Sequence, residues 1–270
     1  MTSVLFVNPR SGGGKAARAG LVERARERGL EVMLVSPERP LAALVEEAVA
    51  GGADALGVAG GDGSLAVVAA AAVAHDLPFV CIPAGTRNHF ALDAGVDRRD
   101  LIGSLDAFTD GVERRIDIAE VNGRLFLNNV SIGVYGDAVH RPGYRDAKAR
   151  TLLATAAQVL GPSAAASGLR LVDDRGLVHS DPAVVLVSNN PYSAGPPQPP
   201  GTRPALDGGR LGILVLDPPG ARAWTETGVE MTASSAVQAG VDGEAVELVP
   251  PLEFAIRPRA LRLLASSQRR

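Results

Sequence analysis

Acidic side chains flanked by glycine are the residues in this chain whose spacing could do chemistry. Residues 58–65 read Val-Ala-Gly-Gly-Asp-Gly-Ser-Leu, an apolar run, a glycine cluster and then a further apolar segment. This pattern predicts a strand, a tight turn and a helix, whose free N–H groups can bind phosphate. Asp62 would repel a phosphate unless its carboxylate holds a metal ion, a ligand hydroxyl or the proton of an attacking group. The stretch favours phosphate chemistry, with an ordinary strand–helix turn as the alternative.

Two later stretches repeat the pairing of acid and glycine. Asp207 lies in Leu-Asp-Gly-Gly, and Asp242 and Glu244 flank Gly243. Each is on its own compatible with an ordinary turn, because Asp-Gly pairs favour turns. Together with a phosphate-type loop they favour a kinase-like site. A G-x-S-x-G elbow is absent and the four histidines lack metal-ligand spacing, which argues against a serine hydrolase and a zinc enzyme.

Composition excludes several other classes. A formal net charge of −3 over 270 residues argues against a nucleic-acid-binding protein. The single cysteine, Cys81, excludes an internal disulfide framework, and its apolar surroundings predict a buried thiol. The first residues lack the features of a signal peptide, and no apolar window reaches the ~20 residues of a membrane span, so we expect a cytoplasmic protein.

The first part of the chain alternates strands and helices. We predict strands over 4–7, 31–35 and 78–82 and before Gly60, with helices over 16–28, 41–50 and 65–74. Such alternation predicts a parallel sheet, which places the loops beginning at Asn8, Gly60 and Gly85 at one edge. The first loop is not a Walker motif, because Pro9 and Ala16 stand where Gly and Ser or Thr are needed.

From about residue 114 the pattern becomes antiparallel. Two short strands surround Asn122-Gly123, a strong hairpin signal, and further strands are predicted over 169–172, 183–187, 211–216 and 234–239 and on either side of Pro258. Residues 190–204 are predicted to be a surface loop. An amphipathic helix is predicted over 144–160; its basic start is either a solvated face or a contact with an anionic membrane.

The motifs together resemble the diacylglycerol kinase catalytic-domain family, which includes bacterial lipid kinases and sphingosine kinases and is related to NAD kinases. The resemblance rests on the sequences at 8–12, 60–64, 83–88, 205–211 and 242–244, and it spans nearly the whole chain. It implies an α/β plus mainly β fold: a Rossmann-like nucleotide-binding domain over 1–115, a β-rich lipid domain over 116–256, and a cleft between them. Residues 257–270 are expected to return to the first domain.

The resemblance also implies a site. Glu244 would be the general base, with Asp242 beside it, and Asp207 would be a metal ligand for Mg²⁺. The residues implied to contact ATP are Asn8, Pro9, Arg10, Ser11, Gly12, Ser36, Gly60, Gly61, Asp62, Gly63, Ser64, Gly85, Thr86 and Asn88. The chain departs from the family pattern at Gly208 and His89, where the family usually has an acid, at Ala66-Val67, where it often has Asn-Glu, and mildly at Ser64, where it usually has Thr.

Two functions follow from the resemblance. The first is an ATP-dependent lipid kinase that phosphorylates a hydroxyl of a diacylglycerol-like or long-chain lipid, located in the cytoplasm and in peripheral contact with the membrane. The second is a catalytically weak or inactive relative that binds nucleotide or lipid for regulation or transport. The late Asp-Gly-Glu favours the first, and the acids absent at Gly208 and His89 favour the second. The sequence leaves the lipid and the oligomeric state open, a homodimer included.

Overall fold

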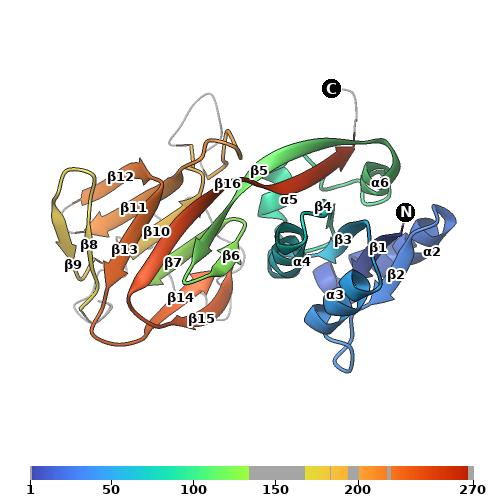
Figure 1. Ribbon diagram of the computed structural model, residues 1–270, viewed down its shortest axis with the longest axis horizontal. Helices are drawn as coiled ribbons and strands as arrows, with labels where there is room; N and C mark the ends of the chain where they lie inside the picture. Colours follow the sequence, from blue (N-terminus) through green and yellow to red (C-terminus); the bar gives the residue numbers. More distant parts are fainter. Residues whose placement is uncertain (1, 134–167, 183, 194–200, 218–219, 267–270) are drawn as a thin grey trace. The chain divides into compact units, whose positions relative to one another are not determined.

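The computed structural model divides the chain into two compact units (Figure 1). It describes residues 2–133, 168–182, 184–193, 201–217 and 220–266. Unit 1 comprises residues 1–116 and 259–270, and unit 2 comprises residues 117–258. The amphipathic helix predicted over 144–160, with its basic start, lies outside the described residues.

Unit 1 alternates strands and helices, as predicted. Its strands are β1 (Ser3–Val7), β2 (Glu31–Leu34), β3 (Ala55–Gly60) and β4 (Pro78–Pro83), followed by β5 (Gly111–Val121), which continues into unit 2. Its helices are α1 (Lys15–Arg18), α2 (Leu21–Glu27), α3 (Leu41–Ala50), α4 (Asp62–Ala74), α5 (His89–Asp93) and α6 (Ala107–Asp110). Two 3₁₀ turns, η1 (Ser11–Gly13) and η2 (Gly103–Asp106), complete the unit.

The sheet of unit 1 is parallel, with strand order β2-β1-β3-β4. The end of the last strand, β16 (Leu252–Ser266), joins it beside β4 and pairs Arg262 with Pro78 and Leu264 with Val80. Residues 4–7 of β1 are all buried, which is typical of a parallel strand covered on both faces. Helices α1 and α2 pack with η2 and α6 on one face, and α4 contacts β3 and β4.

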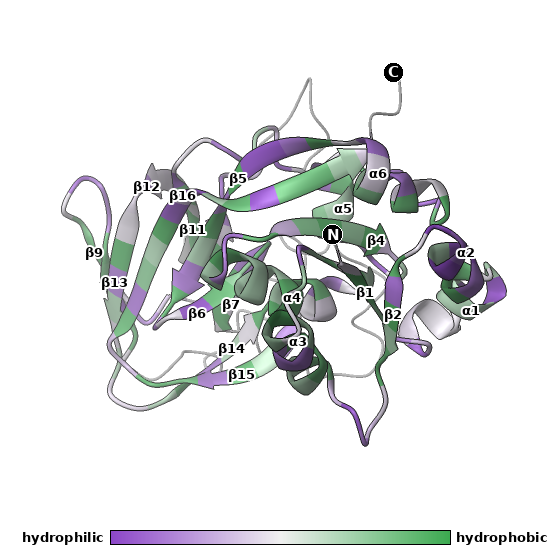
Figure 2. Ribbon diagram, turned by 45° about the vertical axis from the view of Figure 1, so that its right-hand side comes forward, coloured by the Kyte–Doolittle hydropathy of each residue, from purple (hydrophilic) through white to green (hydrophobic). Residues whose placement is uncertain are grey.

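Two predicted helices of unit 1 have other bounds. The helix predicted over 16–28 is broken into α1 and α2, because Gly20 between them has φ +61°, a left-handed conformation that interrupts a helix. The helix predicted from residue 65 begins at Asp62, so Gly63 and Ser64 lie in its first turn. The hydropathy colouring shows that apolar residues dominate β4 and α4 (Figure 2).

Unit 2 consists of antiparallel strands. One sheet has the order β12-β11-β10-β7-β14-β15, formed by β12 (Gly220–Glu226), β11 (Leu211–Asp217), β10 (Val184–Asn189), β7 (Asn129–Gly133), β14 (Val237–Val241) and β15 (Glu244–Leu248). In the other, the first part of β16 pairs with β13 (Gly228–Thr232), which continues to β8 (Arg170–Val172) and β9 (Val178–Ser180). The predicted hairpin is present: β6 (Arg124–Phe126) pairs with β5, and Asn122 and Gly123 both have positive φ.

The core of unit 2 lies between residues of the two sheets. Phe126 and Phe254, with ring centroids 6.5 Å apart, pack in one cluster with residues of β7, β10, β11 and β14. This arrangement is a sandwich, in which each strand directs alternate side chains inward. The predicted antiparallel β-rich domain is therefore confirmed.

One prediction for unit 2 is wrong, and the structure adds a detail to another. The two strands expected around Pro258 are one strand, β16, which accommodates the interruption by a positive φ of +54° at Arg259. The stretch 190–204 has no helix or strand in its described part, as predicted, but two of its residues are buried: Asn190 and Arg203 are 0% and 3% exposed. Both are polar, and their burial is possible because they hydrogen-bond to neighbouring backbone.

Candidate active site

Three loops of unit 1 meet at the carboxyl edge of its sheet. They follow β1, β3 and β4, which are adjacent and parallel, so their ends lie side by side. The Asn8 N–H donates to the Ala59 carbonyl oxygen (3.1 Å), which connects the first loop to the end of β3. The structure thus brings together three of the predicted nucleotide-contacting segments.

Glycines allow these loops to approach one another. A Cβ on Gly12, where φ is +56°, would lie 2.4 Å from the Ala84 carbonyl oxygen. A Cβ on Gly85 would lie 2.4 Å from the Gly61 Cα. No other residue type fits at either position without moving the backbone. The loops therefore form a surface of bare backbone, as a phosphate cradle requires.

Helix α4 begins within this surface. Gly61 is its N-cap and supplies no side-chain cap, and the first N–H groups of a helix have no acceptor within the helix. The helix has 13 residues, so its N-terminus carries the partial positive charge of a full macrodipole. Gly60 must also be small, because a Cβ there would lie 2.7 Å from the Ser64 Cβ.

The Asp62 carboxylate is hydrogen-bonded within the loop surface. Its carboxylate accepts hydrogen bonds from the backbone N–H groups of His89 (3.4 Å) and Phe90 (3.3 Å), at the start of α5. The sequence suggested a metal ion, a hydroxyl or a proton as its partner, whereas the described partner is the backbone of the third loop. Asp62 therefore connects the second loop to the third. Its charge, with the larger effect of burial, raises the pKa of the buried Cys81 thiol.

The third loop is held by Asn88. This residue is 3% exposed, has φ +52°, and its side-chain nitrogen donates to the carbonyl oxygens of Pro83 (3.0 Å) and Gly85 (2.9 Å). Asn88 was predicted to contact nucleotide, and the structure shows that it closes the turn. Thr86 is exposed at the tip. Arg87, which sequence reasoning passed over, has a buried Nη1 without a hydrogen-bond partner among the described residues, so it is a further candidate for contact with an anion.

The remaining predicted nucleotide contacts lie at the same edge. In the first loop the Asn8 side chain accepts the Arg10 N–H (3.0 Å), Pro9 and Arg10 are exposed, and Ser11 opens η1. Ser36 follows β2, and its hydroxyl donates to Glu38 (2.8 Å) and accepts the Arg39 N–H (3.1 Å). The hydrogen bond from Ser36 lowers the pKa of the Glu38 carboxyl.

Lys15 is a structural residue of this edge. Its ammonium group donates to the Pro83 (3.1 Å) and Arg98 (2.8 Å) carbonyl oxygens, which fastens α1 to the third loop. A Walker lysine would instead extend to phosphates, so these contacts agree with the rejection of that motif.

The Asp-Gly-Glu turn lies in unit 2. Asp242 (φ +49°) and Gly243 (φ +87°) form the two-residue connection between β14 and β15, and Glu244 pairs with Val241 across it. The Asp242 carboxylate accepts three backbone N–H groups, from Leu127 (2.8 Å), Asn128 (2.7 Å) and Asn129 (3.2 Å). These contacts occupy both of its oxygens and fix the position of the turn.

Glu244 has different surroundings. Its side chain is 58% exposed, and its carboxylate lies 3.7 Å from the Arg124 guanidinium. An exposed ion pair of this length is weak, so the carboxylate is available to a ligand. The two acids of the motif therefore differ: Asp242 is bound to the backbone and Glu244 faces solvent.

A polar cluster holds the backbone segment that binds Asp242. The buried Arg203 guanidinium donates to the carbonyl oxygens of Leu127 and Asn189 and to the Asn128 side chain (2.8 Å). The Asn189 side chain donates to the Leu127 carbonyl oxygen (3.2 Å) as well. Residues 127–129, which hold Asp242, are thus fixed on both sides. No motif contains Arg203, so sequence reasoning could not find it.

The surroundings of Asp207, the predicted metal ligand, are as follows. Asp207 is exposed, Gly208 offers no side chain, and the described residues contain no group of three His, Cys, Asp or Glu side chains able to hold one. Hydrogen bonds fix this loop instead. The Gly208 N–H donates to the Asn190 side-chain oxygen (2.9 Å), and the Gly209 N–H donates to the buried Asp117 carboxylate (2.6 Å).

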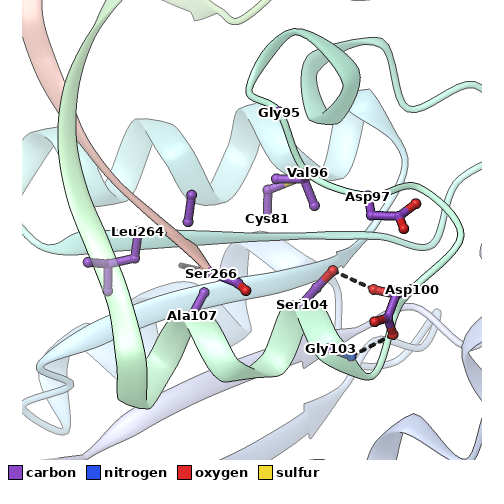
Figure 3. Close-up of a pocket in the computed structure, with 11 residues that line it drawn as sticks. Cys81, Gly95, Val96, Asp97, Asp100, Gly103, Ser104, Ala107, Leu264 and Ser266 are labelled. Carbon is purple, nitrogen blue, oxygen red and sulfur yellow. Dashed lines mark hydrogen bonds between the residues drawn. The ribbon is translucent and has the colours of Figure 1, made fainter. Parts of the chain in front are cut away.

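A small pocket lies elsewhere in unit 1 (Figure 3). Its volume is about 30 Å³, and Cys81, Val96 and Leu264 contribute to its apolar lining. The polar groups at its rim already have partners: the Asp100 carboxylate accepts the Gly103 N–H (2.7 Å), and the Ser104 hydroxyl donates to the Asp100 carbonyl oxygen (2.7 Å). A space of this size holds one or two waters. None of the predicted site residues lines it.

Comparison with known proteins finds lipid kinases that are similar to this chain. Residues 2–121 match the family model described as "Diacylglycerol kinase catalytic domain". The chain is 34% identical over 139 residues to the protein named "Probable lipid kinase YegS-like" from Pseudomonas aeruginosa, covering 50% of this chain and 45% of that protein. It is 33% identical over 120 residues to the protein named "Diacylglycerol kinase" from Mycobacterium tuberculosis, covering 43% of this chain and 39% of that protein.

The fold agrees over a longer range. A crystal structure of a diacylglycerol kinase from Bacillus anthracis superimposes with a TM-score of 0.70 at 18% identity, covering 98% of this chain and 97% of that one. A second structure from the same organism gives a TM-score of 0.76 at 19% identity, with the same coverage. The likeness in sequence spans less than half the length of the curated relatives, whereas the likeness in fold spans nearly all of the chain.

The match to the diacylglycerol kinase catalytic domain over residues 2–121 agrees with the resemblance that the motifs indicated. The predicted fold class is confirmed by the structural neighbours. No helix in the described part of the chain is long and apolar enough to cross a membrane.

Proposed function

We propose that this protein transfers the γ-phosphoryl group of ATP to a hydroxyl of a lipid, with a diacylglycerol-like or other long-chain lipid as acceptor. The observation that carries the proposal is the contact of three glycine-bearing loops at the N-terminus of α4, where a Cβ on Gly12 or Gly85 would strike neighbouring backbone. Backbone N–H groups exposed at a helix start suit the phosphates of a nucleotide. ATP enters with Mg²⁺ bound to its phosphates, as part of the substrate.

In this proposal Glu244 is the general base. An alcohol is a poor nucleophile, so a carboxylate within reach takes its proton as the oxygen attacks the γ-phosphorus. The bond from that phosphorus to the bridging oxygen breaks, and ADP leaves with the electron pair. The exposure of Glu244 supports this role, because an attacking hydroxyl must reach it. Asp242 is assigned a positioning role, since its two oxygens are occupied by backbone N–H groups.

The loop at Asp207 favours a second candidate. The absence of an acid at position 208, and of a metal-binding group among the described side chains, supports a weak or inactive family member that binds nucleotide or lipid for regulation or transport. The two candidates differ in turnover and share nucleotide binding. Peripheral contact with a membrane is compatible with both.

The deciding experiment is phosphate transfer from labelled ATP and Mg²⁺ to a mixed lipid extract in detergent micelles, with the product identified by mass. We expect a phosphorylated lipid from the wild type and from Glu247→Gln, an exposed glutamate of the same strand as Glu244. Glu244→Gln should lower turnover at least about 100-fold, the usual contribution of a general base, and leave ATP affinity by calorimetry unchanged. Full turnover by Glu244→Gln would refute the assignment of the base. Absence of product with retained ATP binding would favour the second candidate.

A further inference from the structure

Arg87, in the loop after β4 of unit 1, has a hydrogen-bond donor that the surrounding protein does not use. Its side chain is partly buried and its Nη1 atom is covered, yet the described residues offer that atom no acceptor. A guanidinium is always charged, and a covered donor of a charged group destabilises a fold when it has no partner. Buried polar groups are nearly always paired in folded proteins. The exception at Arg87 therefore points to an anionic ligand.

The next residue shows the same feature with the opposite polarity. Asn88 is 3% exposed, and its side-chain nitrogen donates to two carbonyl oxygens of the loop, but its side-chain oxygen has no donor within the described ranges. A Cβ on Gly85 would lie 2.7 Å from this oxygen and 3.0 Å from the Gly61 nitrogen. The oxygen therefore lies beside the N-cap of α4. Two adjacent residues, one with a donor and one with an acceptor, lack partners where the loops meet.

The backbone around Arg87 is fixed to the start of α4 on both sides. On one side Gly85 packs against Gly61, since a Cβ on Gly85 would lie 2.4 Å from the Gly61 Cα. On the other side the His89 N–H donates to the carboxylate of Asp62, in the first turn of the helix (3.4 Å). Arg87 is two residues from each contact. It therefore belongs to the surface whose backbone N–H groups suit phosphate.

Three other basic side chains at this edge already bind carbonyl oxygens. Lys15 donates to two of them, and Arg18 donates to the Gly13 carbonyl oxygen. Arg98 donates to the carbonyl oxygen of Arg87 itself (3.3 Å). Of these four cations, Arg87 is the one with a covered nitrogen that lacks an acceptor in the described part of the chain. It is therefore the basic side chain of this edge with the strongest need of a ligand.

The charge of this edge also suits a phosphate. Segments 8–18, 60–66 and 83–99 together carry six lysine or arginine residues and three aspartates. Two of the three acids are engaged by the backbone: Asp62 accepts two N–H groups of α5, and Asp97 accepts the Arg99 N–H (2.8 Å). The excess of positive charge favours an anion, and phosphate oxygens match the planar fork of a guanidinium.

We propose that Arg87 contacts a phosphate group of the bound nucleotide. The inference rests on the proposed function, because it takes a nucleotide as the ligand of the three loops. Arg87 adds a charged side chain to a cradle of backbone N–H groups, and the Asn88 oxygen can accept a hydrogen bond from a hydroxyl or a bound water of the same ligand. The competing role for Arg87 is to brace its loop. The two roles predict different binding and different stability.

The first test is calorimetric titration of the full chain with ATP and Mg²⁺. Arg87→Met, an apolar side chain of similar length, should weaken ATP binding at least about tenfold, which corresponds to about 1.4 kcal/mol. Arg87→Lys keeps the charge but loses the fork, so it should weaken binding by less. The matched control is Arg99→Met, which removes the same charge from an exposed arginine of the same edge and should change the affinity by less than about twofold. Adenosine, measured by its competition with ATP, should bind the wild type and Arg87→Met equally, because it carries no phosphate.

The second test is thermal unfolding with and without nucleotide. Without nucleotide, Arg87→Met should unfold at or above the wild-type midpoint, because the substitution removes a covered donor that has no described acceptor. With ATP and Mg²⁺, its midpoint should rise by less than that of the wild type, because weaker binding stabilises the folded state less. An arginine that only braces the loop would give the reverse pattern: a lower midpoint without nucleotide, and weaker binding of ATP and adenosine alike.

Several results would overturn the proposal. Equal ATP affinity in the wild type and Arg87→Met would remove Arg87 from the nucleotide site, as would the bracing pattern or an absence of ATP binding in the wild type. Unchanged ATP affinity in Arg87→Met with loss of stabilisation by inorganic phosphate would assign Arg87 to a separate anion site. Binding is measured without phosphate transfer, so a kinase assay without product leaves the contact of Arg87 intact. Equal binding by Arg87→Met would likewise leave the kinase intact, and the two proposals fail separately.

Discussion

Asp242 and Glu244 stand two residues apart, and the structure predicts opposite consequences for replacing them by their amides. In Asp242→Asn one carboxylate oxygen becomes an NH₂ group. The best orientation keeps the oxygen that accepts the N–H groups of Asn128 and Asn129, so the NH₂ group then faces the Leu127 N–H at 2.8 Å. Two donors cannot hydrogen-bond to each other, and the two remaining hydrogen bonds become weaker because their acceptor is no longer charged. The backbone itself tolerates the change, because asparagine readily adopts the φ of +49° found at this position.

The size of the effect follows from these three contacts. A hydrogen bond to a charged group contributes about 1.5–3 kcal/mol, and an unsatisfied donor costs a similar amount. Loss of one such bond and weakening of two others should destabilise unit 2 by about 2–4 kcal/mol. For a domain of this size, a loss of about 1 kcal/mol in unfolding free energy lowers the midpoint of thermal unfolding by roughly 2–4 °C. We therefore expect the midpoint to fall by about 5–15 °C.

Glu244→Gln serves as the partner experiment. The side chain is exposed and its contact with Arg124 is a surface ion pair, so the unfolding midpoint should change by less than about 2 °C. Differential scanning calorimetry gives the unfolding midpoint of each variant, and initial rates of lipid phosphorylation, measured well below that midpoint, give its turnover. If Asp242→Asn unfolds as the wild type does but loses turnover, Asp242 acts on the substrate and the positioning role is wrong.

Further predictions concern unit 1, the loop at Gly208, and the buried Asp173. Gly12→Ala should lower ATP affinity at least about tenfold and lower the unfolding midpoint, because the new Cβ would meet the backbone. The new Cβ of Gly13→Ala would have no atom within 4 Å, so this variant should lose only the roughly 1–2 kcal/mol that a left-handed alanine costs. Chelation by EDTA should leave the unfolding midpoint unchanged, and Gly208→Asp should lower it, because a Cβ would lie 2.9 Å from an amide oxygen. Burial opposes ionisation of Asp173, but hydrogen bonds and Arg222 outweigh it and lower its pKa, so its stabilising contribution is present above the pKa of the unfolded chain and is lost as the pH falls through the lower folded value. In acid unfolding followed by circular dichroism, stability should therefore fall less steeply with decreasing pH in Asp173→Asn than in the wild type, in the pH range of the folded pKa of Asp173.

Local sequence patterns were sufficient to predict the architecture, because strands, helices and tight turns are decided by residues that are close in sequence. Alternation of strand and helix predicted the parallel sheet, and Asn122-Gly123 predicted the hairpin of β5 and β6. Helix bounds were less accurate where one glycine decides them: Gly20 breaks a helix, while Gly63 lies inside one. Short strands such as β9 and β15 were missed because they are too brief to show a period.

The contacts of the candidate site could not be predicted in the same way, because they depend on pairs far apart in the chain. Arg203 serves a backbone segment 76 residues earlier, and Asp242 one 115 residues earlier. A buried arginine in a stretch rich in proline and glycine looks like part of a solvated loop until its acceptors are known. Residue type therefore indicated where polar chemistry lies, and only the fold indicates whether a polar group serves the backbone or remains available to a ligand.

The same distinction settles what a glycine-flanked acid means in this chain. Asp62 and Asp242 were the acids most easily read as chemical, since each lies in a turn where glycine would admit a ligand. Both instead accept backbone N–H groups from a segment distant in sequence, and so fix one loop against another. A carboxylate bound in this way is held in place by its hydrogen bonds, which suits a positioning role. Glu244, with no described backbone donor and a weak ion pair, retains the freedom that a general base needs, and for this reason the assignment of catalysis rests on Glu244 rather than on the motif as a whole.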